Sequence, residues 1–247
     1  MLELKGIHTY YGESHILQGI HLQVKEGECV ALLGPNGMGK TTTLRTVMGL
    51  TPARLGTVLF KERDITHYPP FEIARLGIGF VPEDRGLFGD LTVVENLKVP
   101  FLNLRQRQGR RWAEVEDRIY ALFPVLSERK KQMAGTLSGG EQQMLATARG
   151  LISGEEMVLL DEPTEGLAPR VIQNLIGAFR KIMEQKHTML LVEQNIHTAM
   201  EIANRCYILE KGRIKIEEPM SVLCQRPDLL HQYLGIVQTI DSPSVNR

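Results

Sequence analysis

The 247-residue sequence predicts an α/β fold built on a mostly parallel sheet that is covered on both faces. Short apolar stretches rich in β-branched residues recur along the chain, which is the pattern of strands buried on both sides. Between them lie longer segments whose apolar residues follow helical spacing. The alternation of these two patterns is typical of parallel sheets, because each crossover between parallel strands needs a connection of helix length.

The predicted strands are short and end at glycine, proline or polar residues. They are Gly27 to Gly34, Gly56 to Phe60, Ile78 to Pro82, Met157 to Asp161 and Thr188 to Gln194. Two apolar stripes each predict one face of a helix. The first consists of Trp112, Val115, Ile119, Leu122, Phe123 and Leu126, and the second of Val171, Ile172, Leu175, Ile176, Phe179, Ile182 and Met183.

The stretch from about Asp84 to Glu155 is predicted to be a helical subdomain inserted into the sheet domain. Its charged part, Arg105 to Arg118, contains the run RQRQGRR, which is compatible with a nucleic-acid or lipid patch. Acidic residues follow at once, so the sequence favours a solvated helix face. Further on, Asp228 to Leu234 has helical character, and the final SPSVNR is predicted to be a loose tail.

The composition is that of an ordinary globular protein, with 43% hydrophobic and 23% charged residues. Lys and Arg total 29, as do Asp and Glu, so no global field attracts nucleic acid or an anionic membrane, and any anion must be bound locally. The apolar runs are too short to cross a bilayer, and the charged N-terminal residues resemble no export signal, so we expect neither a membrane span nor export. Cys29, Cys206 and Cys224 form no disulfide or zinc pattern, which favours buried thiols in a reducing compartment.

The segment GPNGMGKTT follows an apolar strand directly and fits the pattern G-x-x-x-x-G-K-[ST] of a phosphate-binding loop. Its glycines allow backbone N–H groups to converge on phosphate oxygens at a helix start. The predicted phosphate-binding residues are Gly34, Pro35, Asn36, Gly37, Gly39, Lys40, Thr41 and Thr42. Lys40 would reach the β and γ phosphates, and the Thr41 hydroxyl would hold Mg²⁺. Alone, this loop does not separate ATPases from GTPases or small-molecule kinases.

The segment MVLLDEPT places Asp161 and Glu162 at the carboxyl end of an apolar strand, where ligands bind in open α/β sheets. Asp161 is predicted to act in the second shell of Mg²⁺, and Glu162 to orient or deprotonate an attacking water. By itself an acidic pair after a strand is also a common way to begin a helix. The phosphate loop upstream favours the catalytic interpretation.

The segment LSGGEQQ carries Ser138 and Glu141 in the spacing of a capping box, which predicts a helix over Gln142 to Ile152. A capping box explains the serine and the glutamate but not two consecutive glycines. Glycines at a helix start remove side chains and expose backbone N–H donors. A second anion-binding helix end is therefore predicted.

In this order, the phosphate loop, LSGGEQQ and VLLDEP resemble an ATP-binding cassette (ABC) ATPase, the energy-coupling subunit of ABC transporters. The resemblance extends to about Gly212. It implies a P-loop NTPase core of RecA-like type, with an N-terminal antiparallel β subdomain, an inserted helical subdomain, and ATP and Mg²⁺ as ligands. The implied divisions are residues 1–84 and 156–222 for the core, 85–155 for the helical subdomain and 223–247 for a C-terminal extension.

The resemblance also implies a head-to-tail dimer in which the signature of one subunit closes over ATP on the other. Ser138 and Gly140 would then contact the γ-phosphate held by the partner, and Gly139 and Gln142 would belong to the same nucleotide-binding set. Tyr11 matches the aromatic residue that stacks on adenine in this family. The alternative for Tyr11 is an ordinary strand tyrosine before a turn.

The sequence departs from the family pattern at Glu83, at Ala168 and at Gln194, where a glutamine, a loop aspartate and a switch histidine are usual. Glu83 retains the ability to ligate Mg²⁺ or position water, and the Gln194 amide can donate to a γ-phosphate oxygen without carrying charge. His197 is an alternative to Gln194, although a histidine on a helix surface is favoured. The resemblance thus gives Glu162, Gln194 and Glu83 as catalytic residues, and Thr41, Glu83 and Asp161 as the Mg²⁺ set.

The segments VPE, LTVVENL, LSGGEQQMLA, EGLAP and LLVEQN together resemble one branch, the second ATPase of branched-chain amino-acid importers and of their urea and short-chain amide relatives. The branch implies a different ATPase as partner, two permease subunits and, indirectly, a solute-binding protein, at the cytoplasmic face of the inner membrane. The sequence does not decide whether the isolated chain forms a homodimer, and no nucleic acid is expected as a partner. The permease's cytoplasmic helix would contact Glu83 to Val99.

Two other functional classes remain as alternatives. A cytosolic ABC protein acting on nucleic acid or ribosomes would have two fused cassettes, a long coiled coil or a basic face, and the sequence has none of these. A non-hydrolysing regulatory cassette is suggested by Glu83, Ala168 and Gln194. Against it stand Lys40 and the Asp161–Glu162 pair.

Overall fold

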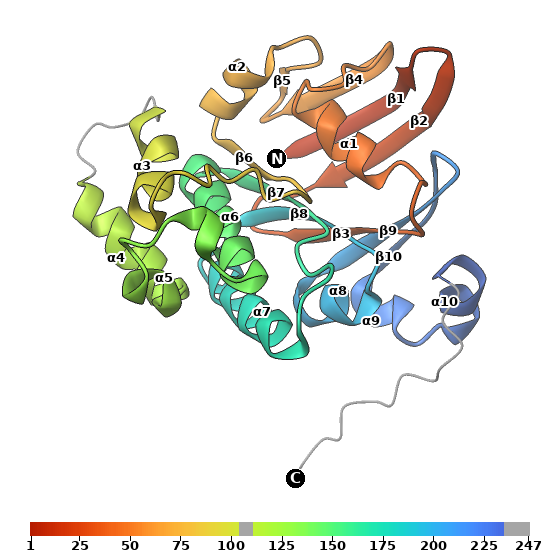
Figure 1. The fold of residues 1–247 in the computed structure, drawn as a ribbon. Coiled ribbons are helices and arrows are strands. Elements are labelled where there is room, and N and C mark those ends of the chain that lie inside the picture. The colour runs from red at the N-terminus through yellow and green to blue at the C-terminus, as the bar shows by residue number, and fades with distance from the viewer. Residues whose placement is uncertain (104–110, 235–247) are drawn as a thin grey trace.

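A computed structural model describes residues 1–103 and 111–234, which form two β-sheets with helices packed beside and between them (Figure 1). The six-stranded sheet has the order β10-β9-β3-β8-β7-β6, and the four-stranded sheet has the order β2-β1-β4-β5. The six strands are β10 (Arg213–Pro219), β9 (Arg205–Glu210), β3 (Cys29–Leu33), β8 (Thr188–Glu193), β7 (Met157–Asp161) and β6 (Ile78–Val81). The four are β2 (Ser14–Val24), β1 (Leu2–Tyr11), β4 (Leu55–Phe60) and β5 (Arg63–Asp64).

The six-stranded sheet is parallel from β9 to β6, and only β10 runs antiparallel to its neighbour. Every residue of β3, β7 and β8 is buried, which is why these strands are uniformly apolar rather than alternating. Because the strands are parallel, the residues that follow β3, β6, β7 and β8 meet at one edge of the sheet. This confirms the predicted mostly parallel sheet.

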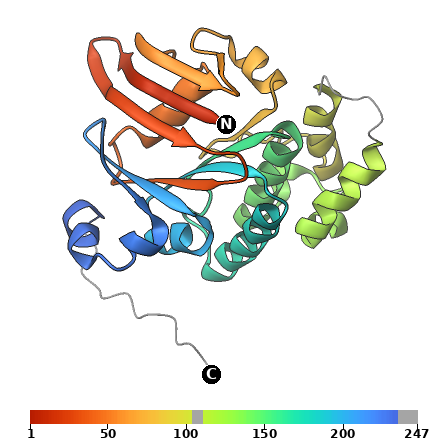
Figure 2. The same ribbon diagram turned by 180° about the vertical axis from the view of Figure 1, so that it is seen from behind.

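Both faces of this sheet are covered, but by different kinds of structure (Figures 1 and 2). On one face, the apolar sides of α6 (Gly139–Ser153) and α7 (Pro169–Glu184) pack with alternate residues of β7 and β8. On the other face, α1 (Lys40–Val47) and the antiparallel sheet form a second cluster. Around β9, α8 (Ile196–Ile202), α9 (Met220–Leu223) and α10 (Pro227–Leu234) close a third.

The predicted strand Gly56 to Phe60 belongs to the antiparallel sheet, where β4 pairs with β1, and not to the parallel one. The long strands β1 and β2, which the residue pattern did not single out, pair with each other as a hairpin. Their burial is mixed rather than continuous, because one face of the hairpin packs on the core and the other meets solvent.

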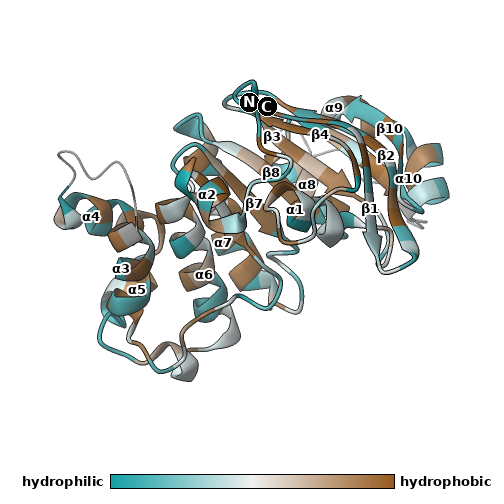
Figure 3. Ribbon diagram, turned by 90° about the horizontal axis from the view of Figure 1, so that it is seen from above, coloured by the Kyte–Doolittle hydropathy of each residue, from teal (hydrophilic) through white to brown (hydrophobic). Residues whose placement is uncertain are grey.

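The described residues between β6 and β7 form helices joined by loops, with no named strand: α3 (Val93–Asn103), α4 (Trp112–Leu122), α5 (Pro124–Glu128), a 3₁₀ turn (Ala134–Thr136) and α6. The prediction of one helix across 112–126 is wrong, because the stripe divides at Phe123. Phe123 adopts φ −131° and ψ 75°, since the following Pro124 disfavours helical backbone before it. Brown and teal alternate along these helices in Figure 3, as expected of amphipathic helices.

Several smaller predictions have definite outcomes. The stretch Asp228 to Leu234 is helical, as α10. Cys29, Cys206 and Cys224 are free thiols, the first two of them buried. Most of RQRQGRR and all of SPSVNR lie outside the described residues. None of the described helices is both long and apolar enough to span a bilayer.

Candidate functional site

The predicted phosphate loop connects β3 to α1 and is built around glycines that no other residue can replace. Gly34 has φ +154°, and a Cβ there would lie 2.3 Å from the carbonyl oxygen of Leu209. Gly39, at the N-cap of α1, has φ +106°, and a Cβ there would lie 2.8 Å from Leu17. The backbone therefore packs closely against β9 and β2, and this packing sets the shape of the loop.

Lys40 is the first residue of α1, and its side chain folds back into the loop. Its Nζ donates to the carbonyl oxygens of Gly34 (2.8 Å) and Pro35 (3.1 Å) and to Oδ1 of Asn36 (3.3 Å). The same Nζ lies 3.0 Å from Oε1 of Glu162, in an ion pair whose side chains are 3% and 8% exposed. A buried ammonium ion is thus fixed at the centre of the loop beside the predicted base.

Thr41 and Asp161 join the loop to the end of β7. The Thr41 hydroxyl donates to Oδ1 of Asp161 at 3.0 Å. Burial raises the pKa of Asp161 to about 6, the Thr41 hydrogen bond opposes the rise, and the charges of Glu162 and Glu83 add to it. Two of the three residues predicted to be near Mg²⁺ are therefore already in contact.

Glu162 follows β7 with φ +43°, a left-handed backbone conformation that is uncommon for a residue with a side chain. Its N–H donates to the carbonyl oxygen of Val192 at 3.0 Å, so the neighbouring strand β8 holds the turn in place. Such outliers persist where surrounding structure fixes them, and they concentrate at functional sites. Here the turn directs the carboxylate to Lys40.

Lys40, Thr41 and Glu162 line a cavity of ≈ 250 Å³ at the carboxyl edge of the parallel sheet. Its walls are Ile16, Asn36, Gly37, Gly39, Lys40, Thr41, Thr42, Glu83, Glu162 and Glu165. All of these except Ile16 and Glu165 were predicted from the sequence. Ile16 reaches the cavity only through strand pairing, which leaves no local signal. Glu165 is an acid in the turn after β7, and its hydrogen bond with Glu162, with burial, raises its pKa.

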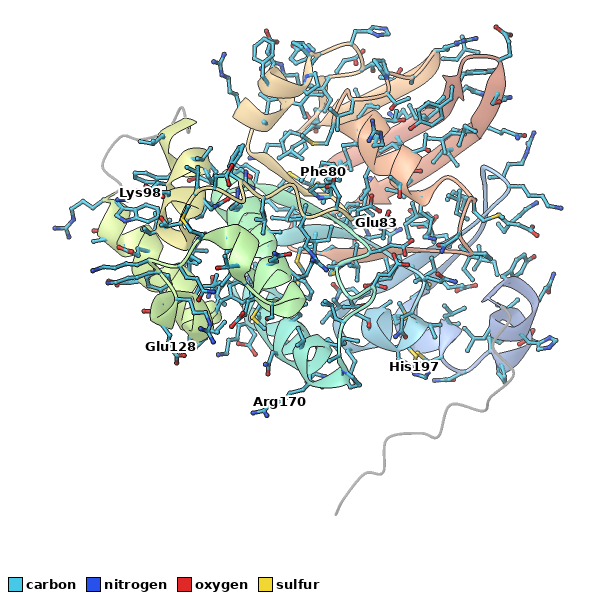
Figure 4. All side chains as sticks on the ribbon, in the orientation of Figure 1. Phe80, Glu83, Lys98, Glu128, Arg170 and His197 are labelled. Atoms are coloured by element: carbon cyan, nitrogen blue, oxygen red, sulfur yellow. The ribbon has the colours of Figure 1, made fainter. Side chains whose placement is uncertain are left out.

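Four further residues that the sequence analysis considered, Tyr11, Gln194, His197 and Ala168, do not line this cavity. Tyr11, at the end of β1, is 45% exposed, and its hydroxyl is 3.3 Å from Oγ1 of Thr51. Gln194 follows β8 and is exposed. His197 lies on α8, well away from Glu83 in Figure 4, and its backbone N–H donates to the Asn195 side chain. Ala168 is the N-cap of α7 and supplies no side-chain cap.

Glu193, the last residue of β8, has no role in the sequence-based predictions although it is only 2% exposed. Its Oε1 accepts from the Thr164 hydroxyl (2.8 Å) and from the Thr164 N–H (3.3 Å). Burial raises the pKa of Glu193 to about 7, against the effect of these hydrogen bonds. It ties the strand that precedes Gln194 to the turn that follows Glu162. The sequence signal that could have identified Glu193 is a charged residue at the end of an otherwise apolar strand.

The signature segment forms the start of α6 with the predicted capping box. Ser138 Oγ is 2.8 Å from Oε2 of Glu141, which also accepts from the Ser138 N–H, and Glu141 N–H donates to Ser138 Oγ at 3.4 Å. Gly140 is buried, and a Cβ there would lie 2.7 and 2.8 Å from the methyl groups of Val171. Packing against α7 thus explains one of the two glycines, which the capping box alone did not. Ser138 and Gly139 are exposed.

The site fits a nucleoside triphosphate with Mg²⁺. The loop offers backbone N–H groups, a lysine ammonium and a helix N-terminus, which suit phosphate oxygens. The cavity offers a metal ion the Thr41 hydroxyl and the Glu83 carboxylate, and the Asp161 carboxylate contacts Thr41. That suits Mg²⁺, which binds through one or two carboxylates, a hydroxyl, waters and substrate phosphates rather than in an all-protein cage.

Comparisons with known proteins agree with this geometry. The family model described as "ABC transporter" matches residues 17–165. The chain is 40% identical over 237 residues to the high-affinity branched-chain amino acid transport ATP-binding protein BraG of Pseudomonas aeruginosa, covering 95% of this chain and 100% of that protein. It is 36% identical to the probable branched-chain amino acid transport ATP-binding protein LivF of Archaeoglobus fulgidus, covering 96% and 100%.

Solved structures give the same result. One, described as the ATP-binding subunit of an ABC transporter, has a TM-score of 0.80 at 26% identity, over 95% of this chain and 96% of that one. An ATP-binding cassette solved as a dimer in a post-hydrolysis state with ADP and Pi has a TM-score of 0.79 at 27% identity, over 89% and 99%. The chain therefore belongs to the ABC transporter family, as an ATP-binding cassette ATPase.

Proposed function

We propose that this chain is the ATP-hydrolysing subunit of an importer of branched-chain amino acids. The observation that carries the catalytic part is the contact between Lys40 and Glu162 at 3.0 Å, beside the Thr41–Asp161 hydrogen bond of 3.0 Å. It brings phosphate-binding and water-activating groups to one sheet edge. The solute is supported by the names of the two relatives, which this chain matches over nearly their whole length.

Hydrolysis is proposed to begin with an exchange of partners at Lys40. Its ammonium, now paired with Glu162, turns to the β and γ phosphates, which leaves the Glu162 carboxylate free to accept a proton from water. Thr41, Asp161 and Glu83 would hold Mg²⁺, which neutralises charge on the transferred phosphoryl group. Gln194 donates a hydrogen bond to a γ-phosphate oxygen, and Tyr11 stacks on adenine.

The second half of each site is proposed to come from another cassette. Ser138 and Gly139 are exposed at the start of α6, so a partner can reach this helix end from outside the chain. A different ATPase subunit is proposed as the physiological partner, with a homodimer possible in isolation. We propose that residues 85–155 move as a helical subdomain against the core of residues 1–84 and 156–222, with 223–247 as an extension.

A cavity of ≈ 620 Å³ between α2 (Pro70–Arg75), β6, α3 and α6 supports docking of a permease. We call it the permease groove; Phe71, Phe80, Pro82, Val99 and Ala146 give it apolar walls, and Arg75, Arg85 and Arg149 line it too. An amphipathic helix from one permease subunit is the proposed occupant, and the second permease subunit would dock on the partner cassette. The chain would then be a peripheral subunit at the cytoplasmic face of the inner membrane, linked only indirectly to a solute-binding protein, without nucleic acid as partner.

The test measures uptake of labelled leucine and of labelled urea by cells that lack this gene and carry the wild type or Glu162→Gln. Loss of leucine uptake, restored by the wild type alone, is the expected result. Loss of urea uptake with intact leucine uptake would move the substrate to the urea or short-chain amide branch. No change in either would contradict the solute assignment.

Two alternatives have their own discriminating measurements. A non-hydrolysing regulatory cassette would release no phosphate in the assembled complex, whereas the proposed subunit releases it in an ATP-dependent manner. A soluble ABC protein outside transport would hydrolyse ATP without any effect of permease subunits on its rate. The Lys40–Glu162 ion pair and the Thr41–Asp161 hydrogen bond bring the predicted phosphate-binding and catalytic residues together, which favours a hydrolysing subunit over a regulatory cassette.

A further inference from the structure

Arg85 lies where three parts of the molecule meet. It follows Glu83, which lines the nucleotide cavity, by two residues. Its own side chain lines the permease groove. Its guanidinium group reaches the first turn of α6, where the signature begins. The sequence-based predictions included Arg85 only within the segment Glu83 to Val99, which was expected to contact the permease, and gave it no role of its own.

The guanidinium of Arg85 donates hydrogen bonds to two neighbouring glutamines of α6. Nη1 donates to Oε1 of Gln142 at 2.9 Å, and Nε donates to Oε1 of Gln143 at 3.3 Å. A Cβ on Gly139 would lie 3.5 Å from Nη2, so the group also packs on the first residue of the helix. Gln142, predicted to serve the partner's nucleotide, is therefore held by Arg85 in this structure.

The contact with Gln143 is costly to lose. Gln143 is 4% exposed, and its Nε2 has no hydrogen-bond partner in the described part of the chain. Loss of Arg85 would leave the other end of the same buried amide without its donor. Arg85 itself has φ +67°, in a turn closed by its N–H to the carbonyl oxygen of Pro82 at 3.0 Å. A strained backbone and a buried amide are thus maintained by one set of contacts.

We propose that Arg85 is a positioning residue that transmits occupation of the permease groove to the signature, through its hydrogen bonds with Gln142 and Gln143. A helix that enters the groove presses on the Arg85 side chain. Its guanidinium then shifts against the two glutamines and turns the start of α6, with Ser138 and Gly139, toward the partner's nucleotide. The proposal rests on the proposed function, since it requires a permease and a second cassette.

The test compares Arg85→Gly and Arg85→Lys with a matched control, Arg129→Ala, in the assembled transporter. Glycine accepts the backbone at φ +67°, so it removes the side chain without adding strain. Arg129 also contacts the start of α6, with Nε 2.6 Å from Oε1 of Glu141, but it does not line the groove. The readout is the ratio of phosphate-release rates with and without the solute-loaded binding protein, beside the Kd for ATP of the isolated chain.

Arg85→Gly is expected to lower the stimulation ratio roughly tenfold, a typical coupling between two sites, with an unchanged Kd for ATP. Arg85→Lys retains the charge but cannot donate to Gln142 and Gln143 with two fixed N–H groups, so an intermediate loss is expected. Arg129→Ala should keep the wild-type ratio. In a Gln142→Ala/Gln143→Ala background, Arg85→Gly should cause no further loss.

Three results would overturn the proposal: an unchanged ratio in Arg85→Gly, an equal loss in Arg129→Ala, or a full additional loss in the double-glutamine background. A wild-type transporter that releases no phosphate, or releases it without stimulation, would contradict the proposed function itself. The proposal would then fall with it, and the wild-type measurement distinguishes this case from a failure of Arg85 alone.

Discussion

The phosphate loop and the signature segment are both helix N-termini suited to anions. The phosphate loop lines its cavity together with predicted catalytic residues of the same chain, whereas no signature residue lines that cavity. Lys40 and Asp161 are 4% and 1% exposed, and each already contacts another residue of the site. Ser138 and Gly139 are exposed, and their capping box satisfies only the helix itself. One region holds charges that were brought out of water by folding, whereas the other presents an exposed helix N-terminus to the outside.

Because of this difference, substitutions in the two regions should have different effects on folding and on hydrolysis. Changes in the phosphate region should affect both hydrolysis and folding, because removing one member leaves a buried charge unpaired. Changes in the signature segment should affect folding only where the residue packs inward. The contrast can be tested at each of the residues that define it.

The largest expected effect is on catalysis. Glu162→Gln should lower phosphate release by roughly 10²–10⁴-fold, because the amide cannot accept a proton from water, while ATP still binds. Glu165→Gln, a carboxylate lining the same cavity, is the matched control and should retain more activity. Turnover in Glu162→Gln close to that of the wild type would remove Glu162 from the role of base.

The next effect is on stability and is specific to the phosphate region. Lys40→Met should lower the free energy of unfolding of the nucleotide-free chain by about 3–5 kcal/mol, because Glu162 keeps a buried charge without its partner. Lys40→Met/Glu162→Gln should recover most of this loss without recovering hydrolysis. Urea denaturation measures both. A double variant as unstable as Lys40→Met would show that lost packing, not charge, is the cause.

A pH dependence of stability should arise from Glu193, beneath the same turn. Burial raises its pKa from 4.5 to about 7, so between these pH values the folded chain binds a proton that the unfolded chain has released. The free energy of unfolding should therefore fall as pH rises through this window, by on the order of 3 kcal/mol. Asp161, with its pKa raised to about 6, acts in the same direction.

Urea denaturation at pH 5 and pH 8 measures this slope. Glu193→Gln should flatten it, while Glu26→Gln, at an exposed position, should leave it as in the wild type. An equally steep profile in Glu193→Gln would assign the slope to other groups.

The smallest effect sharpens the contrast within the signature itself. Gly140→Ala places a Cβ 2.7 Å from Val171 and should cost about 1–3 kcal/mol of unfolding free energy. Gly139→Ala meets only the flexible end of Arg85, at 3.5 Å, and should leave folding almost unchanged. Thermal unfolding compares the two, and Val171→Ala should relieve the first. Equal losses at both glycines would mean that the outward and inward residues do not differ as proposed.

Local sequence was sufficient wherever a few consecutive residues set the geometry. The strands β3, β7 and β8, the phosphate loop, the Asp161–Glu162 turn and the capping box of α6 were all predicted, because apolar runs, glycines and cap residues act over one turn. The prediction of a single helix over 112–126 was wrong, although Pro124 in the sequence indicates the break between α4 and α5. The strand β4 was recognised, but its sheet was not, because pairing with β1 is a long-range contact.

The sequence by itself predicted two anion-binding helix ends and a water-activating acid, since those groups are close in sequence or at strand ends. Only the tertiary structure decided which of them touch. It paired Lys40 with Glu162, placed Val171 against Gly140 and brought Arg85 to Gln142. Such contacts join residues far apart along the chain, and they depend on how buried surfaces fit together, which no local spacing encodes.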